Sequence, residues 1–237
     1  MRGTRPRAIC FDLDDTLLDR GRFLPTVDAT CHELARHLGD VTAEQLQRAN
    51  GQAFSETWRE LDEPWTLGKV ETPVIMRETW RRALSACGYD DDALVTFAYE
   101  THAPLAATAH TLFDDARALL GAIEVPLALI TNGASDLQRE KLRAVGIEER
   151  FDVVVVSGEH GVAKPDGAIF AYALSTLGTG AGDTWHIGDN LHADVGGANA
   201  AGLTSVWINR TGKSRHPSDP APHHEVASLA ELATLLE

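Results

Sequence analysis

The sequence predicts an α/β protein built on a doubly wound parallel sheet, with an all-α domain inserted into it. Two observations lead to this prediction. Short apolar runs bounded by turn residues alternate with amphipathic segments, as in parallel strands joined by right-handed crossover helices. One long stretch, residues 18–106, shows helical patterns without a convincing strand, and it therefore indicates a helical insert.

Five segments are predicted to be buried parallel strands, because each is a short apolar run that ends at turn residues. They are residues 8–11, 125–130, 153–156, 184–187 and 204–208. In an open sheet of this kind, ligands bind beyond the carboxyl ends of the strands. The polar residues directly after these segments are therefore the first candidates for a functional site.

Helical segments are expected between these strands. Residues 136–145 form an amphipathic pattern closed by Gly146, and residues 193–201 form a helix of small residues closed by Gly202. Pro165 suits the first turn of a helix whose apolar residues continue to Leu177. Residues 211–224, rich in Pro and His, are predicted to be a loop, and the leucines of 229–236 indicate a short closing helix.

The insert is predicted to hold four helical segments. Its apolar stripes cover residues 27–38, 43–61, 74–86 and 91–99, with Thr42 as an N-cap and breaks at 39–40, 62–64 and 88. We interpret this region as a helical bundle placed after the first strand. The chain then divides into an α/β core of residues 1–17 and 107–237 and a helical domain of residues 18–106.

Composition and charge limit the classes of function. The chain has 237 residues, 43% of them hydrophobic and 24% charged, which suffices for a large core. A net charge of −14 disfavours nucleic acid and anionic membranes as partners. The three cysteines show no disulfide or metal spacing, and no apolar run approaches the roughly 20 residues of a membrane span. We expect a cytoplasmic protein without nucleic-acid or membrane partners; its oligomeric state stays open.

Polar side chains stand at the ends of four predicted strands and are expected to meet in one cleft. They comprise four carboxylates, a hydroxyl with its neighbouring amide, and one ammonium: Asp12, Asp14, Thr131, Asn132, Lys164, Asp189 and Asp194. Clustered carboxylates need a counter-charge, and all-oxygen ligands favour Mg²⁺ over Zn²⁺. This arrangement predicts phosphoryl chemistry, which depends on positioning and charge neutralisation.

Roles follow for the individual residues. Asp12 is expected to attack phosphorus and form an aspartyl phosphate, and Asp14 to protonate the leaving alkoxide and then deprotonate the hydrolytic water. Lys164 is expected to neutralise the nucleophile and the transferring phosphoryl group. The metal ligands are expected to be Asp12, Asp189 and the backbone carbonyl of Asp14. The phosphate oxygens are expected to bind Thr131 and the amides that follow at Asn132 and Gly133.

Four sequence motifs resemble those of the haloacid dehalogenase superfamily of hydrolases, in the same order. They are Phe11-Asp12-Leu13-Asp14-Asp15-Thr16-Leu17, Ile130-Thr131-Asn132-Gly133, Lys164-Pro165, and Gly188-Asp189-Asn190 with Asp194. The resemblance implies a Rossmann-like core and a helical cap of the subfamily I (C1) type. It also implies a Mg²⁺-dependent phosphatase that acts on a small phosphorylated metabolite, with Thr16, Asn190 and Asp194 in supporting roles.

Alternatives to this function remain open at this stage. Members of the family that dehalogenate 2-haloacids lack the second aspartate of the first motif, so Asp14 favours phosphate transfer. A phosphomutase of the same fold also keeps this aspartate. A non-catalytic binding module is a further alternative, although every reactive side chain is retained. The natural substrate and the residues of the cap that contact it are not determined by the sequence.

Overall fold

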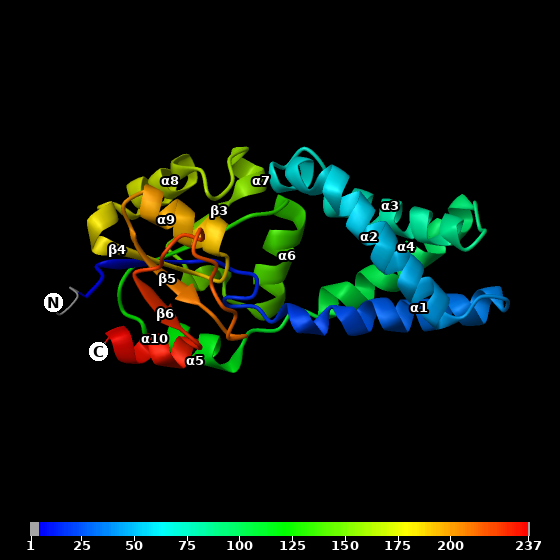
Figure 1. Ribbon diagram of the computed structural model, residues 1–237, viewed down its shortest axis with the longest axis horizontal. Coiled ribbons are helices and arrows are strands. Elements are labelled where there is room, and N and C mark those ends of the chain that lie inside the picture. Colours follow the sequence, from blue (N-terminus) through cyan, green and yellow to red (C-terminus); the bar gives the residue numbers. More distant parts are fainter. Residues whose placement is uncertain (1–4, 237) are drawn as a thin grey trace.

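The computed structural model describes residues 5–236 and contains, within that range, one parallel sheet of six strands in the order β3-β2-β1-β4-β5-β6 (Figure 1). Every neighbouring pair is parallel. The chain order reverses at β1, which lies between β2 and β4, so the sheet is doubly wound as expected. The strands are β1 (Ala8–Phe11), β2 (Leu127–Thr131), β3 (Val153–Val156), β4 (Thr184–Gly188), β5 (Thr204–Ile208) and β6 (His224–Val226).

Helices cover both faces of the sheet. One face packs against α5 (Asp114–Ala122), α6 (Ser135–Val145) and α10 (Leu229–Leu236). The opposite face packs against α8 (Gly167–Leu177) and α9 (Gly197–Ala200). Strand β1 supplies both cores, with Ile9 and Phe11 on one side and Cys10 on the other, so its whole length is buried.

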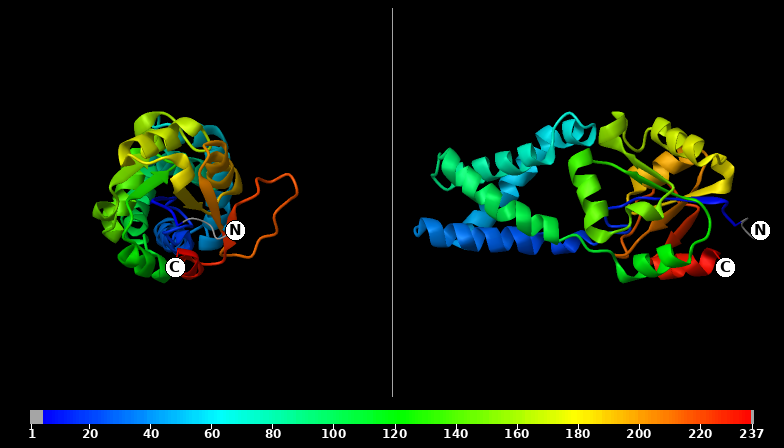
Figure 2. Two further views of the ribbon diagram at one scale, coloured as in Figure 1. Left: turned by 90° about the vertical axis from the view of Figure 1, so that its left-hand side faces the viewer. Right: turned by 180° about the vertical axis from the view of Figure 1, so that it is seen from behind.

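Between β1 and α5 the chain forms four helices, α1 (Leu24–Leu38), α2 (Ala43–Thr66), α3 (Thr72–Ala86) and α4 (Asp92–Thr108). We call them the cap helices. They extend away from the sheet on one side of the molecule and have an apolar core of their own, centred on Trp80 and Leu84 (Figures 1 and 2). The exact division of the chain at residues 17/18 and 106/107 stays a prediction.

The cap helices also touch the core away from their covalent links. The loop between α2 and α3 brings Thr72, the first residue of α3, to α6, where its amide and its hydroxyl donate to Asp136 at 2.9 and 3.1 Å. Nearby, Ser157 at the start of α7 (Ser157–His160) donates its hydroxyl to the carbonyl of Thr66 at 2.6 Å. The cap therefore meets the core both through its covalent links and through this loop.

The structure departs from the expected elements at several points. Helix α2 continues to Thr66 through Pro64, where a break at 62–64 was expected, because Leu61 and Trp65 pack in a small cluster with Ile75. Helix α4 runs to Thr108, well beyond residue 99. Pro165 precedes α8, whose N-cap is Asp166. Residues 191–196 form a π-helical turn before the short helix α9.

The sixth strand was not expected. The predicted loop projects from the body, and β6 follows it directly at the edge of the sheet (Figure 2). Three short 3₁₀ turns occur at Arg20–Arg22, Glu148–Arg150 and Ala181–Asp183. Across residues 5–236, no helix combines the length and the apolar character that spanning a bilayer requires.

Candidate active site

Asp12 directly follows β1, at the carboxyl end of the strand. The strand is fully buried, and the amide of Asp12 donates to Ile187 of the neighbouring β4 at 2.9 Å, so the backbone here is fixed by the sheet. Asp12 Oδ2 accepts from Thr16 Oγ1 at 3.2 Å, and Asp12 Oδ1 accepts from Lys164 Nζ at 2.6 Å. Hydrogen bonds to both carboxylate oxygens therefore fix the orientation of the Asp12 side chain.

Lys164 bridges two carboxylates in the interior. Its Nζ donates to Asp12 and, at the same distance of 2.6 Å, to Asp194. Burial alone would lower the pKa of Lys164, but the two carboxylates outweigh it and raise that pKa, so the amine is an ammonium. Asp194 also accepts from His186 Nε2 at 3.0 Å and from the amide of Asn190 at 3.0 Å.

His186 is a neutral partner of Asp194. Burial lowers the pKa of His186 more than the adjacent carboxylate raises it. Because a carboxylate only accepts, Nε2 carries the proton, and Nδ1 is buried without a partner among the described residues. Burial opposes the ionisation of Asp194, yet Lys164 and His186 hold the pKa of Asp194 well below its ordinary value.

Three carboxylates gather around one point. One oxygen from each of Asp12, Asp189 and Asp194 lies within 4.8 Å of the others. Burial raises the pKa of Asp12 to about 8 against the attraction of Lys164, and burial with two neighbouring carboxylates raises the pKa of Asp189 to about 6. When all three are ionised, the carboxylates exceed the one ammonium by two negative charges, and the raised pKa values of Asp12 and Asp189 reflect the cost of holding that charge in a buried site. The donors are all oxygens. This set fits a Mg²⁺ ion.

Asp14 lies outside this acidic cluster. Its two carboxylate oxygens accept from Lys141 Nζ at 2.8 and 2.7 Å, and one also accepts from Gln138 Nε2 at 3.3 Å. Burial would raise the pKa of Asp14, but Lys141 and the hydrogen bonds hold it below its ordinary value. In this structure Asp14 is therefore an ionised group paired with α6. Its expected role as a metal ligand through the backbone carbonyl stays a prediction.

The residues after β2 have a different arrangement from the one expected. Thr131 is buried at the end of the strand. The side chain of Asn132 binds the backbone of Lys164 twice, donating to its carbonyl and accepting from its amide, both at 2.9 Å. The amide of Gly133 donates to Ser157 Oγ at 2.9 Å. Binding of phosphate by Asn132 and Gly133 stays a prediction, and the observed contacts position the lysine instead.

The supporting residues hold the loops that carry the carboxylates. Asn190 caps the π-helical turn by accepting from the amides of His192 and Ala193, both at 2.9 Å. Gly188 is required because a Cβ there would overlap the carboxyl group of Asp194. Thr16 is fully buried beside Asp12, and its carbonyl accepts from Arg210 at 3.0 Å.

Sequence reasoning missed Lys141, Gln138 and the role of His186. Lys141 and Gln138 lie three residues apart on α6 and are both buried, although they are polar. The available signal was that they lie on the apolar side of an amphipathic helix directly after the second motif. His186 is a buried histidine within β4, and its contact with Asp194 has no signal in the sequence.

The fold and this group of carboxylates define a hydrolase class. The family model of haloacid dehalogenase-like hydrolases matches residues 6–202, and the chain belongs to this family. It is 30% identical over 244 residues to the N-acylneuraminate-9-phosphatase of Mus musculus, which covers 99% of this chain and 95% of the relative. The protein is therefore a hydrolase with phosphatase relatives.

Solved structures show the same fold. The HAD hydrolase YfnB from Bacillus subtilis, in a crystal form bound to magnesium, matches with a TM-score of 0.74 and 27% identity, covering 99% of this chain and 100% of that one. A 2-haloacid dehalogenase from Pseudomonas syringae matches with a TM-score of 0.67 and 28% identity, covering 97% of each chain. Both phosphatase and dehalogenase chemistry therefore occur among the proteins that this chain resembles.

Proposed function

We propose that the protein is a Mg²⁺-dependent phosphatase that hydrolyses a small phosphate monoester through an aspartyl phosphate on Asp12. The acidic cluster carries this proposal. When ionised, Asp12, Asp189 and Asp194 exceed the single ammonium of Lys164 by two negative charges, which a divalent cation would neutralise. Asp12, Asp189 and the carbonyl of Asp14 would hold the ion. When bound, Mg²⁺ supplies charge neutralisation to the transferring phosphoryl group.

Asp12, Lys164 and Asp14 would carry out the remaining steps of the reaction. Asp12 is held by Thr16 and Lys164, so one oxygen is directed for attack on phosphorus while the ammonium stays beside the reacting group. Lys164 keeps its place because Asn132 binds its backbone on both sides. Formation of the P–O bond to Asp12 breaks the bond to the leaving alkoxide, which takes a proton from Asp14.

Asp14 has to leave Lys141 for this step. In the structure its carboxylate is paired with that lysine and is ionised. A rotation away from Lys141 removes the counter-charge and allows Asp14 to carry a proton to the alkoxide. Asp14 then takes a proton from the water that hydrolyses the aspartyl phosphate. The pairing with Lys141 thus describes a resting position of the acid–base residue.

The second candidate is a 2-haloacid dehalogenase, favoured by the structural likeness to the enzyme from Pseudomonas syringae. In that reaction the same aspartate attacks carbon and releases halide. A halide leaving group needs no proton, so Asp14 has no role in that reaction as an acid. The presence of Asp14 therefore favours the phosphatase. The likeness to N-acylneuraminate-9-phosphatase supports a small phosphorylated metabolite as substrate, and the free thiols of the three cysteines fit a cytoplasmic location.

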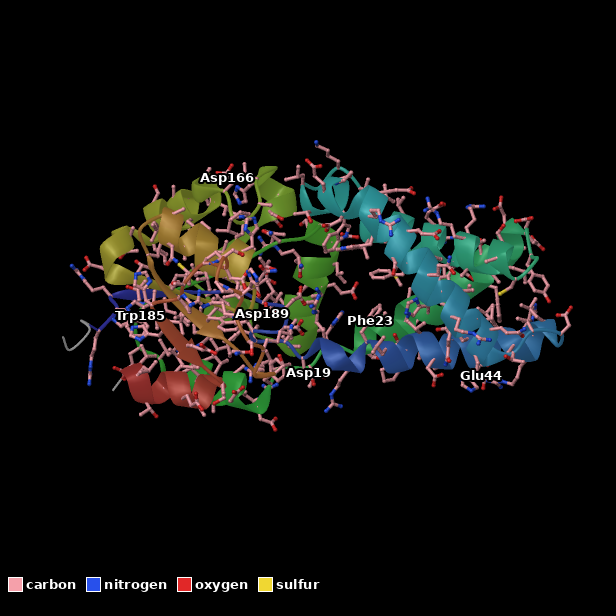
Figure 3. All side chains as sticks on the ribbon, in the orientation of Figure 1. Asp19, Phe23, Glu44, Asp166, Trp185 and Asp189 are labelled. Carbon is pink, nitrogen blue, oxygen red and sulfur yellow. The ribbon has the colours of Figure 1, made fainter. Side chains whose placement is uncertain are left out.

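Phosphate release from a panel of phosphate monoesters, with and without Mg²⁺, tests the proposal. We expect turnover that disappears in excess chelator and in Asp12→Asn. Asp19→Asn is the matched control, because Asp19 lies outside the acidic cluster and its Oδ1 accepts from the amide of Gly21 at 2.9 Å, a hydrogen bond that the asparagine oxygen can keep. This variant is expected to keep full activity (Figure 3). Full activity in excess chelator would refute the metal dependence. Chloride release from 2-chloropropionate without phosphate release would favour the dehalogenase.

A further inference from the structure

His186 is a buried titratable group that the proposed chemistry does not use. It lies in β4, inside the sheet between β1 and β5 (Figure 1). Its side chain is fully shielded from solvent, and the ring of Phe170 on α8 packs edge-on against it, with the ring centroids 5.1 Å apart. Its neighbour on β1 is Cys10, which belongs with Phe170 to the apolar core on this face of the sheet.

The ring of His186 is paired on one side only. Nε2 donates to Asp194 Oδ1 at 3.0 Å, whereas Nδ1 is buried without a hydrogen-bond partner among the described residues. His102, buried in the cap, differs, because Trp80 donates to its Nδ1 and Thr26 lies 3.3 Å from its Nε2. A buried acceptor without a partner lowers stability, so an apolar side chain would suit this strand better. The contact with Asp194 is therefore the feature that distinguishes a histidine here.

Three donors hold Asp194 in place. Oδ1 accepts from Lys164 Nζ at 2.6 Å and from His186 Nε2, and Oδ2 accepts from the amide of Asn190 at 3.0 Å. Both oxygens are held, so the carboxylate has little freedom to rotate. Gly188 lies two residues after His186 on the same face of β4, and a Cβ there would overlap the carboxyl group. Strand β4 thus supplies both a donor and the space for Asp194.

The orientation of Asp194 determines where the ammonium of Lys164 lies. Nζ is 2.6 Å from an oxygen of Asp194 and 2.6 Å from Asp12 Oδ1, so the two carboxylates share it equally. If Asp194 lost a donor, its charge would attract the ammonium more strongly and draw it away from Asp12. His186 opposes this shift without adding a charge, because burial lowers the pKa of His186 and keeps the ring neutral. A charged donor would instead compete with Lys164.

We propose that His186 is a positioning residue for the transfer of the phosphoryl group. Its Nε2–H fixes Asp194, and Asp194 in turn keeps the ammonium of Lys164 beside the proposed nucleophile Asp12. The ring acts through that carboxylate and not on the reacting atoms. The inference rests on the proposed phosphatase function, in which Lys164 neutralises the group that is transferred.

Two substitutions separate the hydrogen bond of His186 from the packing of its ring. His186→Gln removes the ring but keeps an N–H donor near the position of Nε2, whereas His186→Met has a similar length and no donor. Both lose the aromatic contact with Phe170, so the two variants are matched in packing. We expect both to fold with similar melting temperatures. An effect of packing alone would therefore appear equally in both.

The activity assay compares 4-nitrophenyl phosphate with glycerol 2-phosphate at saturating Mg²⁺. We expect His186→Met to lower kcat/KM about tenfold for both esters, with the loss in kcat and little change in KM, because a hydrogen bond that supports the transition state is lost. His186→Gln is expected to stay close to the wild type. An impaired acid would instead affect the glycerol ester more, since its alkoxide is the poorer leaving group.

A second measurement does not depend on turnover. Heteronuclear NMR of the histidine ring nitrogens distinguishes the tautomers, and the signals that are missing from His186→Gln belong to His186. We expect a neutral ring with its proton on Nε2, protected from exchange with solvent. A proton on Nδ1, or on both nitrogens, would overturn the proposal even if His186→Met failed to fold.

The outcomes separate this inference from the proposed function. A wild type that releases no phosphate from any ester would refute the proposed phosphatase. With an active wild type, an unchanged kcat/KM in His186→Met would overturn the role of His186 alone. Equal losses in His186→Met and His186→Gln would also overturn it, because they would assign the effect to packing. A loss in His186→Met that is absent from His186→Gln supports the positioning role.

Discussion

Lowering the pH from 7.5 to 5.0 is expected to destabilise the cap through one buried histidine. His102 on α4 is 5% exposed, and its Nδ1 accepts the indole hydrogen of Trp80 at 3.1 Å. Burial lowers the pKa of His102 to about 4. A proton on Nδ1 would face another donor, so the folded protein keeps this ring neutral.

The sign and size of the effect follow from the two pKa values. The unfolded chain has an ordinary histidine with a pKa near 6.5, so it binds the proton more readily than the folded protein. The stability from neutral His102 is fully present above about pH 6.5 and is lost as the pH falls towards 4. The total is about 3 kcal/mol, of which about 2 kcal/mol is lost by pH 5.0.

Urea unfolding at pH 7.5 and pH 5.0 measures this loss. In His102→Asn the side-chain oxygen still accepts from Trp80 but does not titrate in this range, so we expect it to lose about 2 kcal/mol less than the wild type. His216→Asn, at an exposed histidine, is the control and is expected to behave as the wild type. Equal losses in the wild type and in His102→Asn would refute the reasoning.

Three further predictions concern single residues. Gly133→Ala is expected to cost more than about 2 kcal/mol of unfolding free energy, because a Cβ at its φ of +146° would overlap neighbouring side chains. Gly212→Ala is the control, at positive φ but in open space, and should cost about 1 kcal/mol. Equal midpoints of the two variants in thermal unfolding would contradict this prediction. Arg210→Ala breaks the part-buried ion pair with Asp115 and is expected to lower the free energy of unfolding in urea by about 2–3 kcal/mol. Arg36→Ala breaks an exposed ion pair and should lower it by less than about 1 kcal/mol. A larger loss in Arg36→Ala than in Arg210→Ala would contradict the reasoning. Asn132→Ala is expected to lower kcat/KM at least about tenfold, since it frees the backbone of Lys164, the lysine proposed to neutralise the transferring phosphoryl group. An unchanged kcat/KM in steady-state assays would remove that positioning role.

The sequence predicted the sheet because its strands are nearly uniform apolar runs, which the structure confirms for β1, β3 and β5 to the residue. It also indicated which side chains meet, since the carboxyl ends of parallel strands share one edge. Strand β6 was not predicted, because it has three residues and only one of them, Val226, is buried. A segment so short carries too little periodicity to be distinguished from the preceding loop.

Contacts between distant segments were beyond sequence reasoning. The ion pair of Asp14 with Lys141 joins residues 127 positions apart and depends on how α6 lies against the loop after β1. The continuation of α2 through Pro64 depends on the packing of Trp65, which a local rule for proline does not contain. In both cases tertiary packing outweighs the local pattern.

The contact of Thr72 with Asp136 and of Ser157 with Thr66 has a mechanical consequence. A domain attached to its neighbour at one place can rotate in any direction, whereas a domain held at two separated places can rotate only about the line that joins them. While these hydrogen bonds persist, the cap is held to the core at two places, by its covalent links and by the adjoining ends of α2 and α3. Wide opening then requires at least three hydrogen bonds to break, whereas a rocking motion about that axis leaves them intact.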